Sequence, residues 1–236
     1  MHNDIKTQSI KRRVVSYGLL FIATFLIFAI AEGIRTLLDS YDLNAMFISF
    51  CAGFILFVPL VSLVLHPIIL VDPENNKLRC KSTLMANIGL VFVVQVLFFL
   101  IWMTDAIALY SMYVDNSSFL AKAFNVSSES NSDLSVEFFW FNLLLAWLFA
   151  LLSISIGLLP CLIARIKNRG TVGNFVASIG YAKANKLLFS CYSLIIALSV
   201  VIPLLYAKYL FLLAFPIALS LLIVAIGRGY LNSQRD

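Results

Sequence analysis

Six long apolar stretches dominate the sequence and decide what it can fold into. Each has the length that a helix needs to cross the hydrocarbon of a bilayer, about 20 residues with few charges. They lie near residues 14–34, 45–71, 84–110, 138–163, 187–207 and 209–227. Backbone polar groups in hydrocarbon must be paired within each segment, and the sequence lacks the period-2 alternation of a membrane barrel. It therefore predicts an all-α polytopic membrane protein with six transmembrane helices, folded as a single membrane domain over residues 1–236.

The composition supports a lipid environment. With 61% hydrophobic and only 12% charged residues, the chain has too few charges to cover a water-soluble globule. Its net charge of +5 comes from short basic groups beside the apolar stretches. This placement favours anionic lipid headgroups as partners over nucleic acid.

The last two apolar stretches need a turn between them. Residues 187–226 form one apolar run, which as a single helix would be about 60 Å long, twice the hydrocarbon thickness. We expect the turn at residues 206–209, where Lys208 can reach water and two tyrosines can lie at the interface.

The distribution of basic residues predicts the orientation. The side that holds both termini receives fourteen of the seventeen Lys and Arg residues. The remaining three are Arg35, Lys122 and Lys208. Because cytoplasmic loops are enriched in Lys and Arg, we expect cytoplasmic termini, an outer loop at 114–136 and a basic cytoplasmic loop at 164–186. The expected location is a bacterial inner (plasma) membrane.

The first stretch has a second interpretation. A basic group at residues 11–13, an apolar run and Ala29-Ile30-Ala31 resemble a signal peptide with its cleavage site. The run is longer than a usual signal-peptide core, which favours an uncleaved first helix. Cleavage would leave five helices in the same orientation.

Polar residues at membrane depth are candidate functional residues because they are costly to bury. The ionisable ones near the outer side are Glu32, Arg35, Asp105 and Glu137. Glu32 and Arg35 are three residues apart on one helical face and are expected to neutralise each other. The alternative hypothesis is a proton or cation site formed by Glu32, Asp105 and Gln95.

Other polar residues in the spans have a structural interpretation. Gln95, Ser153 and Ser155 lie near the middle of their stretches, where such side chains usually bond across helices and contribute about 0.6 kcal/mol each. His66 precedes Pro67, which is expected to kink the helix. A histidine at a kink is more often a hydrogen-bond donor than a proton carrier.

Catalytic and cofactor motifs are missing from the sequence. We find no H-E-x-x-H, G-x-S-x-G, P-loop or dinucleotide-binding pattern, and therefore expect neither an enzyme nor a cofactor. The four cysteines have no metal-ligand spacing, and free thiols are expected. They are Cys51, Cys80, Cys161 and Cys191.

The segment at 164–186 combines basic residues with glycines. Gly170 and Gly173 permit positive φ, and the Thr171 hydroxyl can cap a helix. The basic residues around them are Arg165, Lys167 and Arg169. The simplest interpretation is a loop that rests on anionic lipid, with residues 175–181 entering the interface as a strand or a short helix. A phosphate-like ligand or a protein partner remains an alternative.

The run GTVGNFVASIGY at residues 170–181 resembles the cytoplasmic G-x-T-x-G-K-x-x-x-G-ϕ-x-V segment of the RDD family of small multi-pass membrane proteins. The basic group ending at Arg13 is similar to the arginine before that family's first span. Asn174 stands in place of the motif lysine, and the family's aspartate in the first helix is missing. The resemblance covers about a fifth of the chain. It implies a membrane protein with Arg13, Thr171 and Gly173 as motif residues, in a family for which ion- or proton-coupled transport has been proposed.

Two functional hypotheses follow. The first is a small transporter or permease-like component, coupled to protons or cations. The second is an accessory or assembly subunit that works by helix packing with a protein partner or as a homo-oligomer. Transporters often contain inverted repeats, and none is evident in this sequence.

Overall fold

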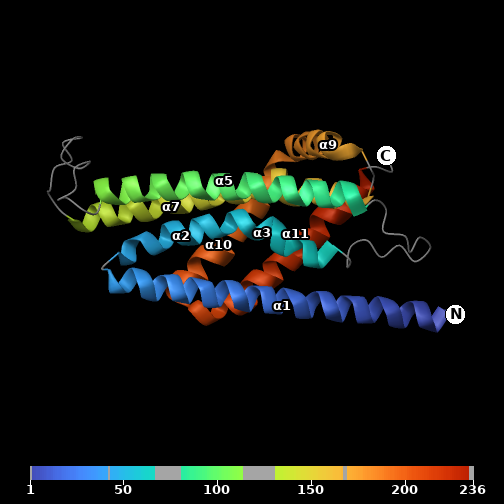
Figure 1. The fold of residues 1–236 in the computed structure, drawn as a ribbon, viewed down its shortest axis with the longest axis horizontal. Coiled ribbons are helices and arrows are strands. Elements are labelled where there is room, and N and C mark those ends of the chain that lie inside the picture. Colours follow the sequence, from blue (N-terminus) through green and yellow to red (C-terminus); the bar gives the residue numbers. More distant parts are fainter. Residues whose placement is uncertain (1, 42, 67–80, 114–130, 167–168, 234–236) are drawn as a thin grey trace.

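The protein is an all-helical bundle in the computed structural model, which describes residues 2–41, 43–66, 81–113, 131–166 and 169–233 (Figure 1). The α-helices in these ranges are α1 His2–Ser40, α2 Phe47–Phe54, α3 Val58–Ser62, α5 Lys81–Tyr113, α7 Asn131–Leu152, α8 Leu159–Ile166, α9 Gly170–Ala184, α10 Lys186–Tyr206 and α11 Phe211–Asn232. Short irregular turns join them: η1 Asn44–Met46, η2 Ile55–Phe57, η3 Leu63–Leu65 and η5 Lys208–Leu210 are 3₁₀-helical, and η4 Ser153–Leu158 is π-helical.

Six helices are long and apolar enough to cross a membrane. These spans are Arg13–Ser40, Phe47–Leu65, Leu84–Ala108, Phe138–Ile166, Lys186–Tyr206 and Lys208–Asn232. The predicted number of helices is confirmed, and so is the final hairpin. Helix α10 ends at Tyr206, and the backbone N–H of Leu210 donates to the Ala207 carbonyl at 2.7 Å where the chain turns.

Several helices are longer than the sequence predicted. Helix α1 continues to Ser40 because its last turns still pack through the buried Leu38. Helix α7 begins at Asn131, inside the predicted loop 114–136, whose residues 114–130 lie outside the described ranges. The predicted loop 164–186 contains the end of α8 and the whole of α9, so most of it is helical.

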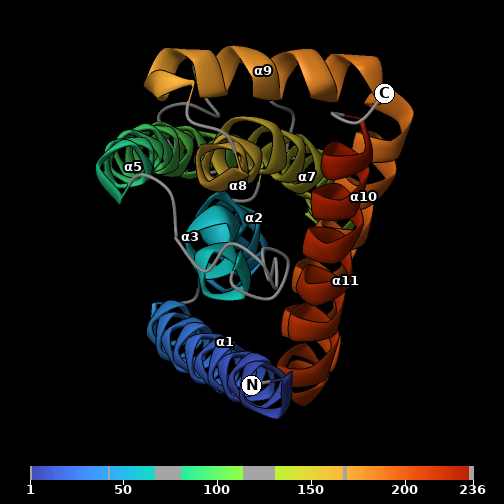
Figure 2. The ribbon, with the colours of Figure 1, turned by 90° about the vertical axis from the view of Figure 1, so that its right-hand side faces the viewer.

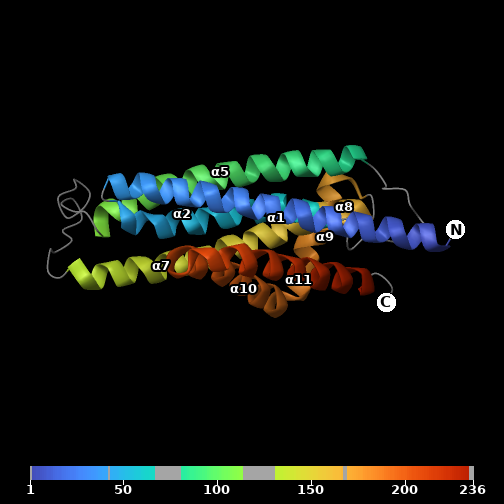
Figure 3. The same ribbon diagram turned by 90° about the horizontal axis from the view of Figure 1, so that it is seen from below.

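The span that contains α2 and α3 is at the centre of the bundle. Viewed along the spans, it has α1 below it, α5 and α7 with α8 above it, and the α10–α11 hairpin on its right (Figure 2). In the apolar segment of this span 61% of the residues are buried, whereas the corresponding share for the span Leu84–Ala108 in α5 is 17%. Figure 3 shows the α10–α11 hairpin beside α7, with which α10 packs. The central helix thus contacts most of the others.

The two ends of the bundle are distinct. We call the end where α1 begins and α11 finishes the terminal end (Figures 1 and 3). The turn end is the opposite one, where α1 passes to α2 and α10 turns into α11. Helix α9 lies crosswise to the spans near the terminal end (Figure 2).

The outer surface of the bundle is apolar. Large side chains such as Phe21 on α1, Val93 on α5 and Leu213 on α11 are more than half exposed. Water-soluble monomers rarely expose apolar surface on this scale. The surface and the six spans are consistent with an integral membrane protein.

Candidate functional site

Two irregular helices cross in the middle of the bundle. Pro59 has no N–H, so the Ile55 carbonyl, four residues earlier, lacks the usual α-helical donor and instead accepts the Val58 N–H in the 3₁₀ turn η2. The Ser153 hydroxyl lies against this carbonyl at 2.9 Å and against the Leu56 carbonyl at 3.1 Å. Ser153 begins the π-helical segment η4, whose wider turn is often found at functional sites. The predicted hydrogen bond across helices is confirmed for Ser153. It is not seen for Gln95, whose amide has no partner among the described residues.

A glycine permits the close crossing. A Cβ atom on Gly157 of η4 would lie 2.4 Å from Cγ of Pro59 and 2.6 Å from Nε2 of Gln95. Real Cβ atoms do not approach other atoms this closely, so glycine is required unless the helices separate. Gly157 therefore brings α3, α5 and η4 together at one point.

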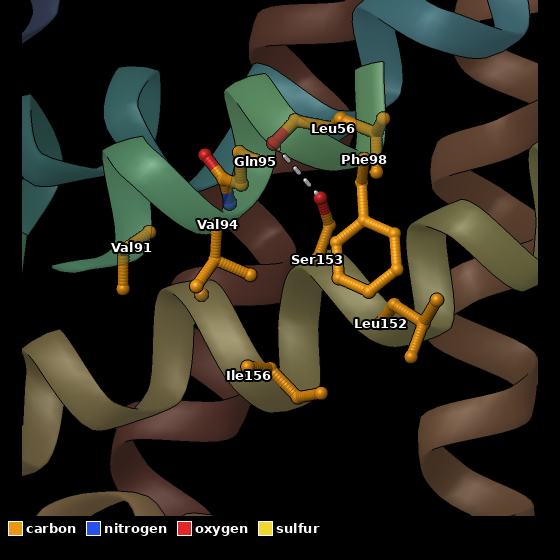
Figure 4. Close-up of a pocket in the computed structure, with 9 residues that line it drawn as sticks. Leu56, Val91, Val94, Gln95, Phe98, Leu152, Ser153 and Ile156 are labelled. Carbon is orange, nitrogen blue, oxygen red and sulfur yellow. Dashed lines mark hydrogen bonds between the residues drawn. The ribbon is translucent and has the colours of Figure 1, made fainter. Parts of the chain in front are cut away.

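Gln95 of α5 lies beside this crossing, in a small pocket between α5 and η4 (Figure 4). The pocket has a volume of about 20 Å³, enough for about one water molecule. The side chain of Gln95 is only 4% exposed, and neither Nε2 nor Oε1 has a hydrogen-bond partner among the described residues. The other residues that line the pocket are Leu56, Val91, Val94, Phe98, Leu152, Ser153, Ile156 and Gly157. The arrangement offers one amide, with two donors and one acceptor oxygen, in an apolar wall.

A second group of buried polar side chains lies nearer the turn end and is fully paired. The Ser49 hydroxyl donates to Oδ1 of Asn142 at 2.7 Å, and Nδ2 of Asn142 donates to the Phe138 carbonyl at 2.7 Å. The indole N–H of Trp102 donates to the Ser49 carbonyl at 3.0 Å. These bonds join α2, α5 and α7, as structural hydrogen bonds between membrane helices do.

Glu32 has a different partner from the one the sequence suggested. Its Oε2 atom lies 2.6 Å from Nζ of Lys208, and the two side chains are 27% and 40% exposed. Arg35 instead donates from Nη1 to the Leu204 carbonyl at 3.4 Å and lies over the Phe47 ring. The expected Glu32–Arg35 pair is therefore replaced by a contact between α1 and the α10–α11 turn.

The candidate ion site is not assembled as one cluster. Asp105 is exposed on α5, ten residues beyond Gln95, which corresponds to about 15 Å along a helix. Glu32 is on α1 and is already bound to Lys208. Glu137 belongs to the second turn of α7. Of the predicted site residues Glu32, Asp105 and Gln95, the last lines the small pocket between α5 and η4.

The predicted loop motif is dispersed. Arg13 is exposed on α1, on the opposite side of the bundle from α9 (Figure 2). Gly170 has φ 73°, which confirms the expected positive φ, and Gly173 is inside α9. The first turn of α9 has no side-chain cap, so the capping role predicted for Thr171 is wrong. Lys167 lies outside the described residues.

The other basic motif residues flank α9. Arg165 is in the last turn of α8, and its buried Nε has no hydrogen-bond partner among the described residues. Arg169 is the exposed residue just before α9.

Near the terminal end, sequence reasoning missed two buried amides and misjudged one histidine. Asn87 of α5 donates to the Pro160 carbonyl at 3.3 Å, and Asn174 of α9 is fully buried. His66 is fully buried, and neither ring nitrogen has a partner in the described part of the chain, so its predicted donor role is not seen. Asn174 could have been found from its spacing to Ser178, one helical turn later.

The described residues contain no group of three or more His, Cys, Asp or Glu side chains that could hold a metal ion. Cys51, Cys161 and Cys191 are free thiols, as predicted. Protein-family models, curated proteins and solved structures gave no match to the chain. The structure therefore defines a class of protein, a bundle of six helices with the length and apolarity of membrane spans. A small, mostly apolar pocket lies between α5 and η4, beside the buried Gln95 amide.

Proposed function

We propose that the chain is a small integral membrane permease that passes a small uncharged polar solute through the Gln95 pocket. The observation that carries the proposal is the Gln95 amide, which is 4% exposed and has no protein partner among the described residues. Burying an amide without a hydrogen-bond partner lowers the stability of the folded protein by about 1–3 kcal/mol. Because Gln95 gains no hydrogen bond from the described residues that offsets this cost, a role in binding a ligand is favoured. A solute with both a donor and an acceptor would satisfy it.

The backbone around Gln95 supports a transport site. Secondary transporters bind substrates near the bilayer midplane, where interrupted helices meet. Here η2 and Pro59 interrupt the central span, and η4 interrupts the span Phe138–Ile166 next to it. Both interruptions are at the level of Gln95, as the contact of Gly157 with Pro59 and Gln95 indicates.

The same geometry favours an uncharged solute over an ion. The residues that line the pocket carry no charge. Glu32 is neutralised by Lys208, and Asp105 is exposed on the outside of α5. Coupling to protons or cations through these carboxylates is therefore not part of the proposal.

The test is solute flux in vesicles that contain the purified protein. Urea and formamide serve as probes, and vesicle swelling is followed by light scattering. Gln95→Met keeps the side-chain length but removes the amide, and we expect flux to fall about tenfold, the loss of about 1.4 kcal/mol. Gly89→Ala is the matched control, because an added Cβ there meets no atom within 4 Å.

Two further variants separate this site from the carboxylates. Glu32→Gln and Asp105→Asn should leave urea and formamide flux unchanged. Wild-type flux no greater than that of protein-free vesicles would overturn the proposal, and a loss in the carboxylate variants alone would move the site to them.

A non-transporting accessory subunit is the second candidate. The close packing at Gly157 and the small volume of the pocket favour this role. Purification in gentle detergent tests it. A stoichiometric partner together with no solute flux would support this role.

The proposed orientation has both termini in the cytoplasm of a bacterial inner membrane, and it rests on the basic residues at the terminal end. Reporter fusions at the C-terminus, active only on one side of the membrane, test this orientation. Activity of a periplasm-specific reporter there would contradict it.

A further inference from the structure

Helix α9 has its polar side chains inside and its apolar side chains outside. Asn174 and Ser178 are fully buried against the bundle, whereas Val172, Val176 and Ile179 are 77%, 64% and 46% exposed. Both sets recur at helical spacing, so they form two opposite faces. A surface helix in water shows the reverse arrangement. The outer face of α9 is therefore suited to a solvent that is not water.

The inner face fixes α9 to the bundle. The Ser178 hydroxyl donates to the Ser155 carbonyl in η4, the segment that also supplies Ser153 and Gly157 to the pocket. One turn later in the same half of the helix, the Tyr181 ring packs edge-on against Tyr230 at 5.2 Å and against Phe189 at 5.8 Å. These contacts hold the C-terminal half of α9 against the bundle, with the apolar stripe on the opposite face.

The position of α9 identifies what surrounds that stripe. It connects the span Phe138–Ile166 to the span Lys186–Tyr206, both of which meet the membrane surface at the terminal end. Figures 1 and 2 show α9 perpendicular to the spans and on the flank of the bundle, outside α5 and α8. A helix in this position lies in the interface between acyl chains and headgroups.

The charges around α9 are of one sign. The basic residues between positions 165 and 186 are Arg165, Lys167, Arg169, Lys183 and Lys186, and this segment has no Asp or Glu. Lys183 in the last turn of α9 and Lys186 at the start of α10 are exposed. Because phosphate groups of anionic lipids lie just above the acyl chains, basic residues beside an apolar stripe match both layers at once.

We propose that α9 is an interfacial helix that binds anionic phospholipid, with Val172, Val176 and Ile179 among the acyl chains and the flanking Lys and Arg residues at the phosphates. The occupant of the outer face is lipid of the surrounding bilayer. This assignment does not depend on what passes through the Gln95 pocket.

The depth of α9 is tested with a spin label in lipid nanodiscs, using the full chain with its four cysteines replaced by alanine. Val176→Cys carries the label, and Asn232→Cys, at the exposed end of α11, is the aqueous reference. We expect the Val176 label to collide with oxygen, which dissolves in lipid, and to be protected from a water-soluble nickel reagent. Equal nickel accessibility at the two sites would overturn the proposal.

Other occupants give different signals in the same experiment. Strong dipolar broadening between labels at Val176 would indicate a second copy of the chain. A label that is exposed to nickel in nanodiscs but protected in native membranes would indicate a protein partner. Either result contradicts the lipid assignment.

Lipid selectivity is tested with Lys183→Gln combined with Lys186→Gln. The protein is placed in mixed phosphatidylglycerol and phosphatidylcholine, and the lipid that stays bound to it is identified. We expect the enrichment of phosphatidylglycerol in this bound lipid to fall about fivefold for each charge removed. Lys11→Gln on the distant α1 is the control and should leave contacts at α9 unchanged. Unchanged retention in the double variant would overturn the electrostatic part, even if the Val176 label is in lipid.

Discussion

Two groups of buried polar side chains lie along the central helix, and only one of them is paired. Near the turn end, Ser49, Asn142 and Trp102 satisfy one another and nearby carbonyls across three helices. At the Pro59 crossing, the Ser153 hydroxyl is paired but the Gln95 amide is not. We call these the paired group and the Gln95 crossing.

The difference separates stability from function. A paired amide gains its hydrogen bonds and holds helices in register, whereas an unpaired one lowers the free energy of unfolding. Residue type alone does not distinguish them, because Asn142 and Gln95 carry the same functional group. Their neighbours do, since Asn142 faces a hydroxyl and Gln95 faces apolar side chains and Gly157.

The largest expected effect is that of Gly157→Ala, which would break the Gln95 crossing. The new Cβ would overlap the Pro59 ring, which cannot rotate away, and we expect the free energy of unfolding to fall by about 3 kcal/mol. Gly53→Ala is the control near the paired group. Its Cβ would lie 2.9 Å from the Phe99 ring, which can turn, so a loss of about 1 kcal/mol is expected. Equal losses in denaturant unfolding would show that the crossing is not tightly packed.

Replacing the amides of Asn142 and Gln95 by apolar side chains is expected to change the free energy of unfolding in opposite directions. Asn142→Leu leaves the Ser49 hydroxyl without its acceptor and should cost about 1–2 kcal/mol. Gln95→Met removes an unpaired amide and should raise the free energy of unfolding by about 1–2 kcal/mol, even as solute flux falls. Denaturant unfolding in detergent micelles measures both. A loss of stability in Gln95→Met would show that Gln95 is a structural residue.

The helices were predictable because their signal is local. Apolar runs of membrane length and the hairpin around Lys208 need no knowledge of neighbours, and both are confirmed. The faces of α9 were not predictable in this way, because its pattern of Asn174 and Val176 has meaning only when the surrounding solvent is known. The state of Gln95 likewise depends on Pro59 and Gly157, which meet it only in the folded chain.

The smallest expected effect concerns the ion pair that sequence spacing assigned wrongly. Glu32 and Lys208 are separated by 176 residues, whereas Arg35 is one helical turn away from Glu32. A double-mutant cycle of Glu32→Gln and Lys208→Gln should give a coupling of about 0.2–1 kcal/mol, because both side chains are partly exposed and screened by salt. The same cycle with Arg35→Gln should give a coupling close to zero, since Arg35 binds the Leu204 carbonyl. A stronger coupling to Arg35 than to Lys208 would restore the helical pair and remove the contact between α1 and the α10–α11 turn.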